Sequence, residues 1–489
     1  MFQIIAYALT FLLCVLVLAK VRLRTVRLAV LLVASGGLYL TWSPWFAAVL
    51  ATSTVMNYVV GRWLRRKRSG SVLGLGILLN LALLVTFKYL PEAAVHLPFS
   101  SLQSFSHLAM PLGISFWTFQ AMSYLFDVFQ GEEIDPTFFE FALYLAFFPV
   151  TISGPVCRLS EMLPQFRSEY ATRWDDLIDG LRRIAIGVLM MQLAKLLGQG
   201  ILAGDGISSG FDRVTQWSGA DAWCLAFGYG LQLFFDFAGY SHIAIGAAKA
   251  LGFTIPENFA RPFASTSASM FWTRWHMSLS FWIRDYVFFP MTQMRREVWW
   301  RNSCFLISMT LFGLWHKASV LFLLWGLYHG VLLVLHRQVE ALGRKFDWTP
   351  PERLWNGLSW IVTMCLVNLG WIPFRASSLS EARQMLSAIL SPATYRAHFL
   401  SGSLYLLVLA LAVGYAILLL VSNALDRSLE NETTNNETTE SGAYAGPMAL
   451  LARWRWFWIT PLYGLALLVL LFVTLSRGTS TAQLMYGNF

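Results

Sequence analysis

Apolar runs of a length that can span a membrane recur along the whole chain of 489 residues. A helix of roughly 20 apolar residues crosses the hydrocarbon core of a bilayer, and its backbone hydrogen bonds are satisfied within the helix. Only 13% of the residues are charged and 56% are hydrophobic, whereas soluble domains are about 25% charged. The chain is therefore predicted to be an all-α, polytopic membrane protein. A membrane β-barrel would instead show alternating segments of ~10 residues.

The apolar pattern predicts about 10–12 transmembrane or re-entrant helices. The expected spans are residues 2–19, 28–41, 45–60, 71–90, 108–128, 184–203, 222–250, 305–335, 355–373, 402–422 and 457–475. Glycine, proline or charge interrupts the apolar segments 137–152 and 271–290, which favours re-entrant or interfacial helices. We expect one membrane domain over residues 1–489. It would comprise N-terminal helices (1–130), a core that bears the motifs (137–336) and C-terminal helices (355–475).

Charge predicts the orientation in the membrane. Basic residues cluster after the first and third apolar runs, at residues 20–27 and 62–68, and the positive-inside rule places such clusters in the cytoplasm. Both termini are then expected outside, with residues 374–400 as an outer loop. Residues 426–446 are polar and acidic, which predicts a flexible cytoplasmic loop. The net charge of +9 fits anionic lipids, and nucleic acid is not an expected partner.

Two patterns in the sequence predict no site. The five cysteines are scattered through apolar segments without ligand spacing, so neither a disulfide framework nor a metal site is expected. Residues 206–210 fit the pattern G-x-S-x-G, but no strand–turn–helix is predicted around them, as a serine hydrolase would require.

Three histidines in residues 271–330 are the strongest candidates for chemistry, because an ionisable group at membrane depth is costly. His316 lies between two apolar helices within 305–335. A neutral imidazole there could act as a general base, or it could tie helices together through one hydrogen bond. His276 is either functional or an interfacial residue that pairs with Asp285 or solvent. For His329 packing is favoured, because Gly326 and Gly330 form a small-xxx-small pattern around it.

An acidic residue and a basic stretch accompany these histidines. Asp236 lies in the apolar run Phe-Phe-Asp-Phe and needs a partner, as a structural anchor or to orient a catalytic group. Arginines crowd the flanks of His276, where guanidinium groups could bind the phosphates of a donor such as coenzyme A. The alternative is simple positive-inside topology. The arginines are Arg261, Arg274, Arg284, Arg295, Arg296 and Arg301.

Four blocks, residues 147–166, 231–263, 271–290 and 313–330, resemble the membrane-bound O-acyltransferases. The similarity is strongest to the bacterial branch that includes alginate O-acetyltransferase and the D-alanyl transferase of teichoic acid. The resemblance maps the two signature polar positions of the family onto His316 and His276, and a conserved family aspartate onto Asp236. Two motifs differ from the family pattern. The usual Trp-His-Gly ends in Lys317, and the usual Gly-Tyr-Ser-Asp ends in His242.

The resemblance implies helices around a central funnel or tunnel in a bacterial inner membrane. Acetyl-CoA would enter from the cytosol as donor, without a permanently bound cofactor. His316 would be the general base, and His276 would position the thioester or the acceptor. Asp236 would orient this constellation or stabilise the imidazolium. The candidate donor-binding residues are Arg274, Arg284, Arg295, Arg296 and Trp275. The expected acceptor is an extracytoplasmic polysaccharide (alginate, cellulose or peptidoglycan), reached directly or through a periplasmic partner protein.

Two alternatives remain open at the level of sequence. The same chemistry could transfer D-alanine from an acidic carrier protein to teichoic acid. A different class of protein, a proton-coupled transporter or flippase, could use buried histidines as a proton relay. Acyl transfer by the purified protein would distinguish an enzyme from a transporter.

Overall fold

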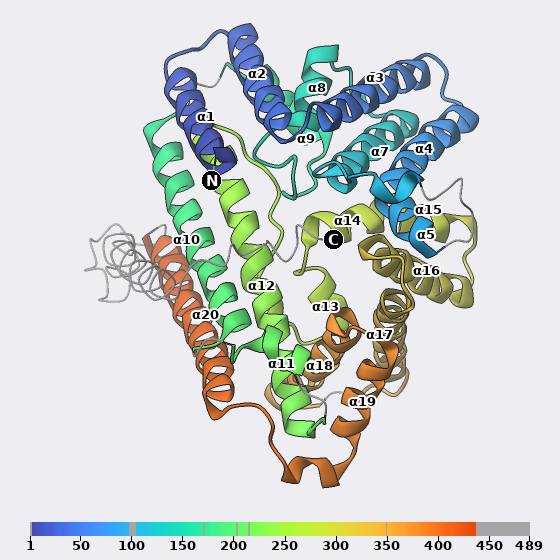
Figure 1. Cartoon of the computed structure of the whole chain (residues 1–489), viewed down its shortest axis with the longest axis vertical. Helices are drawn as coiled ribbons and strands as arrows, with labels where there is room; N and C mark the ends of the chain where they lie inside the picture. Colours follow the sequence, from blue (N-terminus) through green and yellow to red (C-terminus); the bar gives the residue numbers. More distant parts are fainter. Residues whose placement is uncertain are drawn as a thin grey trace. The chain divides into compact units, whose positions relative to one another are not determined.

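The computed structural model describes residues 2–96, 104–169, 172–201, 204–213, 216–348 and 350–436 (Figure 1). These residues form helices and turns, with one isolated antiparallel bridge between Phe259 and Trp275 and no β-strand among them. The predicted all-α class is confirmed. The expected span at 457–475 lies outside the described residues.

The chain divides into two compact units that are interleaved in sequence. The first comprises Met1–Ile184, Ser241–Ala260 and Trp272–Val339, and the second comprises Ala185–Tyr240, Arg261–Phe271 and Glu340–Phe489. Helices α10 (Trp174–Gln199), α12 (Gly219–Ala250) and α17 (Val320–Lys345) contribute residues to both. The expectation of one domain over the whole chain stays a prediction.

Five stretches of helix are long and apolar enough to cross a membrane, which agrees with a polytopic membrane protein. They are Arg24–Trp42, Gly70–Val95, Val320–Lys345, Glu352–Arg375 and Gly402–Ser422. Other predicted spans are helical too: α1 (Phe2–Leu18), α3 (Pro44–Arg66), α7 (Ile114–Gln130), α10 and α12. Length and composition thus located these elements, because a bilayer demands continuous apolar helix.

The two segments expected to be interrupted are indeed broken. In the first, α8 (Phe138–Ala146) is followed by turns through residues 148–153. In the second, α13 (Ala268–Trp272), α14 (Met277–Ile283), a π-helix (Arg284–Phe288) and α15 (Phe289–Met294) follow one another. The π-helix is tied down by Tyr286, whose hydroxyl donates to Asp127 Oδ1 at 2.6 Å.

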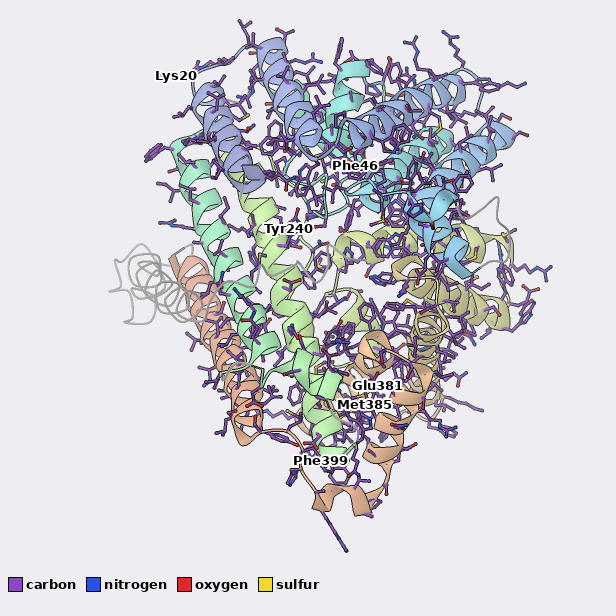
Figure 2. All side chains as sticks on the ribbon, viewed as in Figure 1. Lys20, Phe46, Tyr240, Glu381, Met385 and Phe399 are labelled. Carbon is purple, nitrogen blue, oxygen red and sulfur yellow. The ribbon has the colours of Figure 1, made fainter. Side chains whose placement is uncertain are left out.

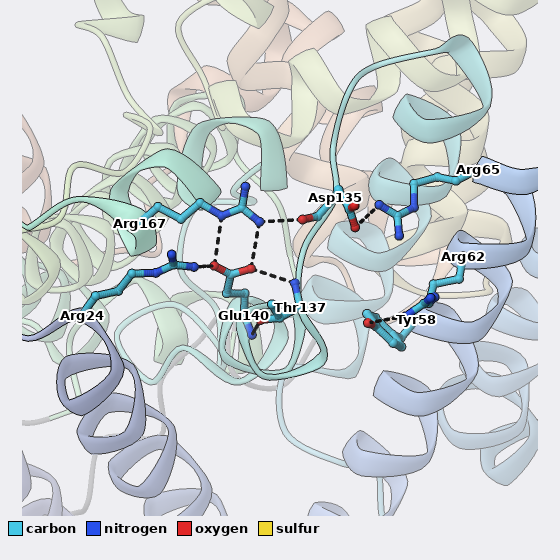
Figure 3. A network of polar contacts seen from close by, with 8 residues as sticks. All are labelled: Arg24, Tyr58, Arg62, Arg65, Asp135, Thr137, Glu140 and Arg167. Atoms are coloured by element: carbon cyan, nitrogen blue, oxygen red, sulfur yellow. Dashed lines mark hydrogen bonds and ion pairs between the residues drawn. The ribbon is translucent and has the colours of Figure 1, made fainter.

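A buried carboxylate holds the start of α8 (Figure 3). Glu140 is 0% exposed; its Oε2 accepts from Thr137 N at 2.7 Å and its Oε1 from Arg167 Nε at 3.0 Å. Arg24, at the beginning of α2 (Arg24–Trp42), donates to the same carboxylate. Burial raises the pKa of Glu140, but the hydrogen bonds from Arg167 and Thr137 outweigh it and lower the pKa to about 2. Glu140 therefore stays ionised and links two segments far apart in sequence.

The second unit has its own buried anchor. Asp221, near the start of α12, is fully buried. Its carboxylate accepts from Tyr405 Oη at 2.5 Å and from the backbone N–H of Phe399 (labelled in Figure 2) at 2.9 Å. The turn that precedes α20 (Gly402–Asn436) is thereby fixed to α12.

Two stretches predicted as loops contain helix. The stretch 374–400 contains α19 (Leu379–Leu390), capped by Ser378, whose Oγ accepts from Glu381 N at 3.2 Å. The helix buries Met385 on one face (Figure 2), so amphipathic packing outweighs its polar content. The polar stretch 426–446 is predicted to be a loop, but α20 continues to Asn436, and residues 437–446 lie outside the described residues. No glycine or proline interrupts residues 426–436, and extending an established helix costs little.

Candidate functional site

The candidate site lies in the first unit, where α16 (Val298–His316) ends at His316 and α17 begins at Val320. Ser319 directly precedes α17, and its carbonyl accepts from Leu323 N at 3.0 Å. His316 is 4% exposed. Its imidazole is stacked on Phe312 at 5.2 Å between ring centroids and lies edge-on to Trp325 at 5.6 Å. The ring is thus held in an aromatic, water-poor environment.

Glycines let α16 and α17 pack unusually closely at this point. A Cβ on Gly326 would lie 2.8 Å from Thr310 Cα, and one on Gly330 would lie 3.0 Å from Leu306 Cα. Carbon atoms in contact normally keep 3.5–4.0 Å apart, so only glycine fits at Gly326. The close approach predicted from the small-xxx-small pattern is confirmed. His329, between these glycines, is fully buried and packs edge-on to Trp272 at 5.1 Å.

His276 has an unusual backbone conformation. It precedes α14 with φ 44° and ψ 51°, in the left-handed region. Residues with a Cβ rarely adopt this region, and such strain is found preferentially at functional sites. The surrounding backbone holds it, since Met277 N donates to Asn258 O at 2.8 Å and Ala260 N donates to Arg274 O at 3.0 Å.

Hydrogen bonds around His276 determine its tautomer. His276 Nδ1 lies 3.3 Å from Asn258 Oδ1, and that oxygen also accepts from Ser278 Oγ at 2.5 Å and Ser278 N at 3.4 Å. Asn258 Nδ2 donates to Ser241 Oγ at 3.0 Å. The backbone N–H of Ser278 can only donate, so the facing atom of Asn258 is its oxygen, and His276 Nδ1 must carry the proton. In a neutral ring, Nε2 then holds the lone pair.

The structure brings His276 and His316 to the same pair of aromatic rings. Phe312 and Trp315 lie 6.4 and 6.5 Å from the His276 centroid. The same rings lie 5.2 and 4.7 Å from His316. Trp315 Nε1 is buried and has no hydrogen-bond acceptor among the described residues. The two imidazoles therefore contact one pair of rings, Phe312 and Trp315, which we call the aromatic wall. The Trp315 indole N–H is the hydrogen-bond donor that this wall offers.

Asp236 belongs to the second unit, whereas both histidines belong to the first. It lies on α12 and is 7% exposed in a run of buried phenylalanines. Its predicted action on the histidines stays a prediction. The alternative partner proposed for His276, Asp285, forms ion pairs with Arg158 at 2.6 Å and Arg284 at 2.7 Å.

The histidine that departs from the family-like Gly-Tyr-Ser-Asp pattern also has a defined partner. Arg183 Nε donates to His242 Nδ1 at 3.2 Å, and the same guanidinium forms an ion pair with Glu257. Glu257 thus supplies a carboxylate beside Arg183 although His242 replaces the usual aspartate.

The candidate donor-binding residues lie along residues 274–296. Arg274 is half-buried, and Arg284 forms its ion pair with Asp285 and lies over Phe281 at 4.6 Å. Arg295 and Arg296 are exposed between α15 and α16. Trp275 is buried and packs edge-on to Phe259 at 5.1 Å. The arginines follow one stretch of chain, and their role in binding a donor stays a prediction.

Sequence reasoning missed Asn258, Ser278 and Trp315 as members of the site. Asn258 and His276 are only 18 residues apart, but the chain reversal that joins them depends on the isolated bridge from Phe259 to Trp275. The available signal was an asparagine within the family-like block 231–263. Among the described residues, no three His, Cys, Asp or Glu side chains gather as metal ligands.

Comparison with known proteins gives consistent matches. The model of the family described as membrane-bound O-acyltransferase matches residues 100–372. "Probable alginate O-acetylase AlgI" of Pseudomonas aeruginosa is 34% identical over 76% of this chain and 71% of its own. Peptidoglycan O-acetyltransferase of Helicobacter pylori is 30% identical over 73% of each chain. Teichoic acid D-alanyltransferase of Bacillus subtilis is 32% identical over 61% of this chain and 75% of its own.

Proposed function

Because this chain belongs to the membrane-bound O-acyltransferase family, we propose that it moves acetyl groups from cytosolic acetyl-CoA to an extracytoplasmic polysaccharide. It is a multi-pass membrane protein and an acyltransferase. The names of the relatives that cover most of this chain support acetyl as the acyl group and a polymer outside the cytoplasm as the destination. The polymer would be alginate, cellulose or peptidoglycan, reached directly or through a periplasmic protein.

In the proposed reaction the acceptor hydroxyl attacks the thioester carbonyl. A C–O bond forms, the C–S bond of acetyl-CoA breaks, and the hydroxyl proton passes through His316 to the departing thiolate. Burial among Phe312, Trp315 and Trp325 suits His316 to this role, because an apolar environment favours the neutral imidazole that can accept a proton. The exclusion of water would also protect the thioester from hydrolysis.

His276 and Trp315 would position the reacting groups. The Asn258 contact fixes the His276 ring, which would position the thioester or the acceptor. The buried Trp315 indole N–H could donate to the carbonyl oxygen, on which negative charge develops. The role kept for Asp236 is the one implied by its match to the family aspartate, to orient this constellation or to stabilise the imidazolium. The arginines at 274, 284, 295 and 296, with Trp275, would bind the phosphates and adenine of the donor.

We further propose that the protein resides in a bacterial inner membrane with both termini periplasmic. Five basic residues lie at the C-terminal end of α3, from Arg62 to Arg68, and the positive-inside rule places them in the cytoplasm. Single cysteines introduced at residues 68 and 398, in a variant without the native cysteines, would test this. A membrane-impermeant maleimide added to intact spheroplasts should label position 398 only.

The observation that carries the proposal is the pairing of His276 and His316 on one aromatic wall. The experiment is acetyl transfer by purified protein, with CoA release and acetylated oligosaccharide measured separately. His316→Ala should lower kcat about 100- to 10,000-fold, because general acid–base catalysis contributes 10²–10⁴-fold. His398→Ala is the matched control, since His398 is exposed in the second unit, and it should behave as wild type. Full activity of a folded His316→Ala variant would refute the proposal.

A second candidate, D-alanyl transfer from a carrier protein, is favoured by the similarity to the teichoic acid enzyme of Bacillus subtilis. The exposed Arg295 and Arg296 would then contact an acidic carrier. Assays of the purified protein with D-alanyl carrier protein and with acetyl-CoA as donors would distinguish the two proposed reactions. Turnover of the carrier alone would replace the first proposal by the second.

A further inference from the structure

A π-helical turn lies directly against the end of α16 that carries His316. The helix α4 (Gly70–Leu84) passes into a π-helix at Val85–Tyr89 and then into α5 (Leu90–His96). π-Helical turns are rare and occur frequently at functional sites. Here the wider turn presents two consecutive polar side chains, Lys88 and Tyr89, to the same neighbouring helix.

Both side chains bond to carbonyls that α16 cannot satisfy itself. The last four carbonyls of an α-helix lack an intrahelical partner, and in α16 they include those of Leu314 and Trp315. Tyr89 Oη lies 3.2 Å from Leu314 O and 3.1 Å from Trp315 O, and Lys88 Nζ donates to Trp315 O. The π-helical turn thus caps the end of α16 at the carbonyls of Leu314 and Trp315, the two residues that precede His316.

Lys88 contacts the side chain of Trp315 as well as its backbone carbonyl. Its ammonium group lies 4.6 Å from the centroid of the Trp315 ring, in a cation–π arrangement. A positive charge is also favourable beside the C-terminus of a helix, where the peptide dipoles place partial negative charge. A third contact joins α5 to the residue that follows His316. Glu92 pairs with Lys317 at 3.3 Å, and both side chains are about half exposed.

We propose that Lys88 is a positioning residue for acyl transfer. It holds the last turn of α16 and the Trp315 ring so that the His316 imidazole and the Trp315 indole N–H face the reacting groups. Tyr89 assists through the same carbonyls. This inference rests on the proposed function, because it assigns Lys88 to the alignment of the proposed general base.

The test compares Lys88→Met, Lys88→Arg, Tyr89→Phe and Glu92→Gln with wild type in acetyl transfer. Methionine keeps an apolar stem of similar length and removes the donor and the charge. Lys88→Met should lower kcat about 10- to 100-fold with the KM for acetyl-CoA unchanged, because small displacements of a reacting group are costly. Arginine restores a charged donor, so Lys88→Arg should regain most of the loss. Glu92→Gln, which breaks only the half-exposed pair, should stay within about twofold.

Hydrogen exchange gives a readout that does not depend on activity. Amides of the last turn of α16 should exchange faster in Lys88→Met and not in Glu92→Gln, because only the former loses a cap on those carbonyls. Should Lys88→Met fail to accumulate, Tyr89→Phe carries the test. It should lower kcat about threefold and accelerate the same amides, and wild-type kcat with wild-type exchange would overturn the inference.

His316→Ala, measured in parallel, separates the two proposals. If His316→Ala is inactive while Lys88→Met keeps wild-type kcat, the positioning role is wrong and the proposed function stands. If His316→Ala is fully active, the proposed function fails and this inference fails with it.

Discussion

Replacing Gly326 by alanine should separate α16 from α17 and misalign His316. A Cβ at this position would lie 2.8 Å from Thr310 Cα and closer still to Met309 O. Since contacting carbon atoms sit about 3.5–4.0 Å apart, the two helices must move apart by about 1 Å. Both contacts are to backbone atoms, so no side-chain rotation can relieve them. Overpacking of this kind typically costs 1–3 kcal/mol.

The effect on activity should be larger than the effect on stability. His316 is the last residue of α16, and the Trp325 ring, one residue before Gly326, lies 5.6 Å from it. A displacement of about 1 Å at a catalytic group can cost ~100-fold in rate. We therefore expect Gly326→Ala to lower kcat about 100-fold and to lower the melting temperature by several degrees, while the purified protein stays monodisperse.

Gly343→Ala is the matched control on the same helix. A Cβ at Gly343 would meet no atom within 4 Å, and alanine is favoured over glycine in a helix by about 1 kcal/mol. This variant should therefore be as active as wild type and at least as stable. Acetyl transfer and thermal unfolding in the same detergent would measure both variants. Wild-type kcat in Gly326→Ala would refute the inferred coupling between helix spacing and His316.

Two further predictions concern buried polar networks. Asn258→Leu should lower kcat about 100-fold or more, because it removes the acceptor that fixes the His276 tautomer. Asn258→Asp keeps an oxygen at this position and should lower kcat less. A larger loss of kcat in Asn258→Asp than in Asn258→Leu would contradict the tautomer argument. Glu140→Gln should destabilise the protein by about 1–3 kcal/mol at pH 7, because it removes the buried charge that the half-exposed Arg24 and Arg167 pair with. The ordinary pKa of this carboxyl is 4.5 and the native one is about 2, so its contribution is complete above pH 4.5 and is lost as pH falls toward 2. The stability difference between wild type and Glu140→Gln should therefore shrink as the pH of the unfolding measurement falls from 7 to 3.

The sequence alone determined the membrane class and most of the helices, and it identified the histidines as candidates for chemistry. These features follow from local physics: a bilayer requires continuous apolar helix, and an ionisable side chain inside it needs a compensating role. The Gly326–Gly330 pattern likewise predicted close helix packing, since only small side chains allow it. Local propensity failed for 374–400 and 426–436, where amphipathic packing and extension of an existing helix produced helices from polar sequence.

Only the tertiary structure decided how the site is assembled. Lys88 reaches Trp315 across 227 positions, and Arg24 reaches Glu140 across 116. Such pairs depend on the register in which helices pack, and many registers bury the same apolar faces equally well. The His276 tautomer depends in the same way on a chain reversal that no periodicity encodes. Apolar periodicity sets which residues are buried, whereas the positions of donors and acceptors within the packed core set which histidine nitrogen carries the proton.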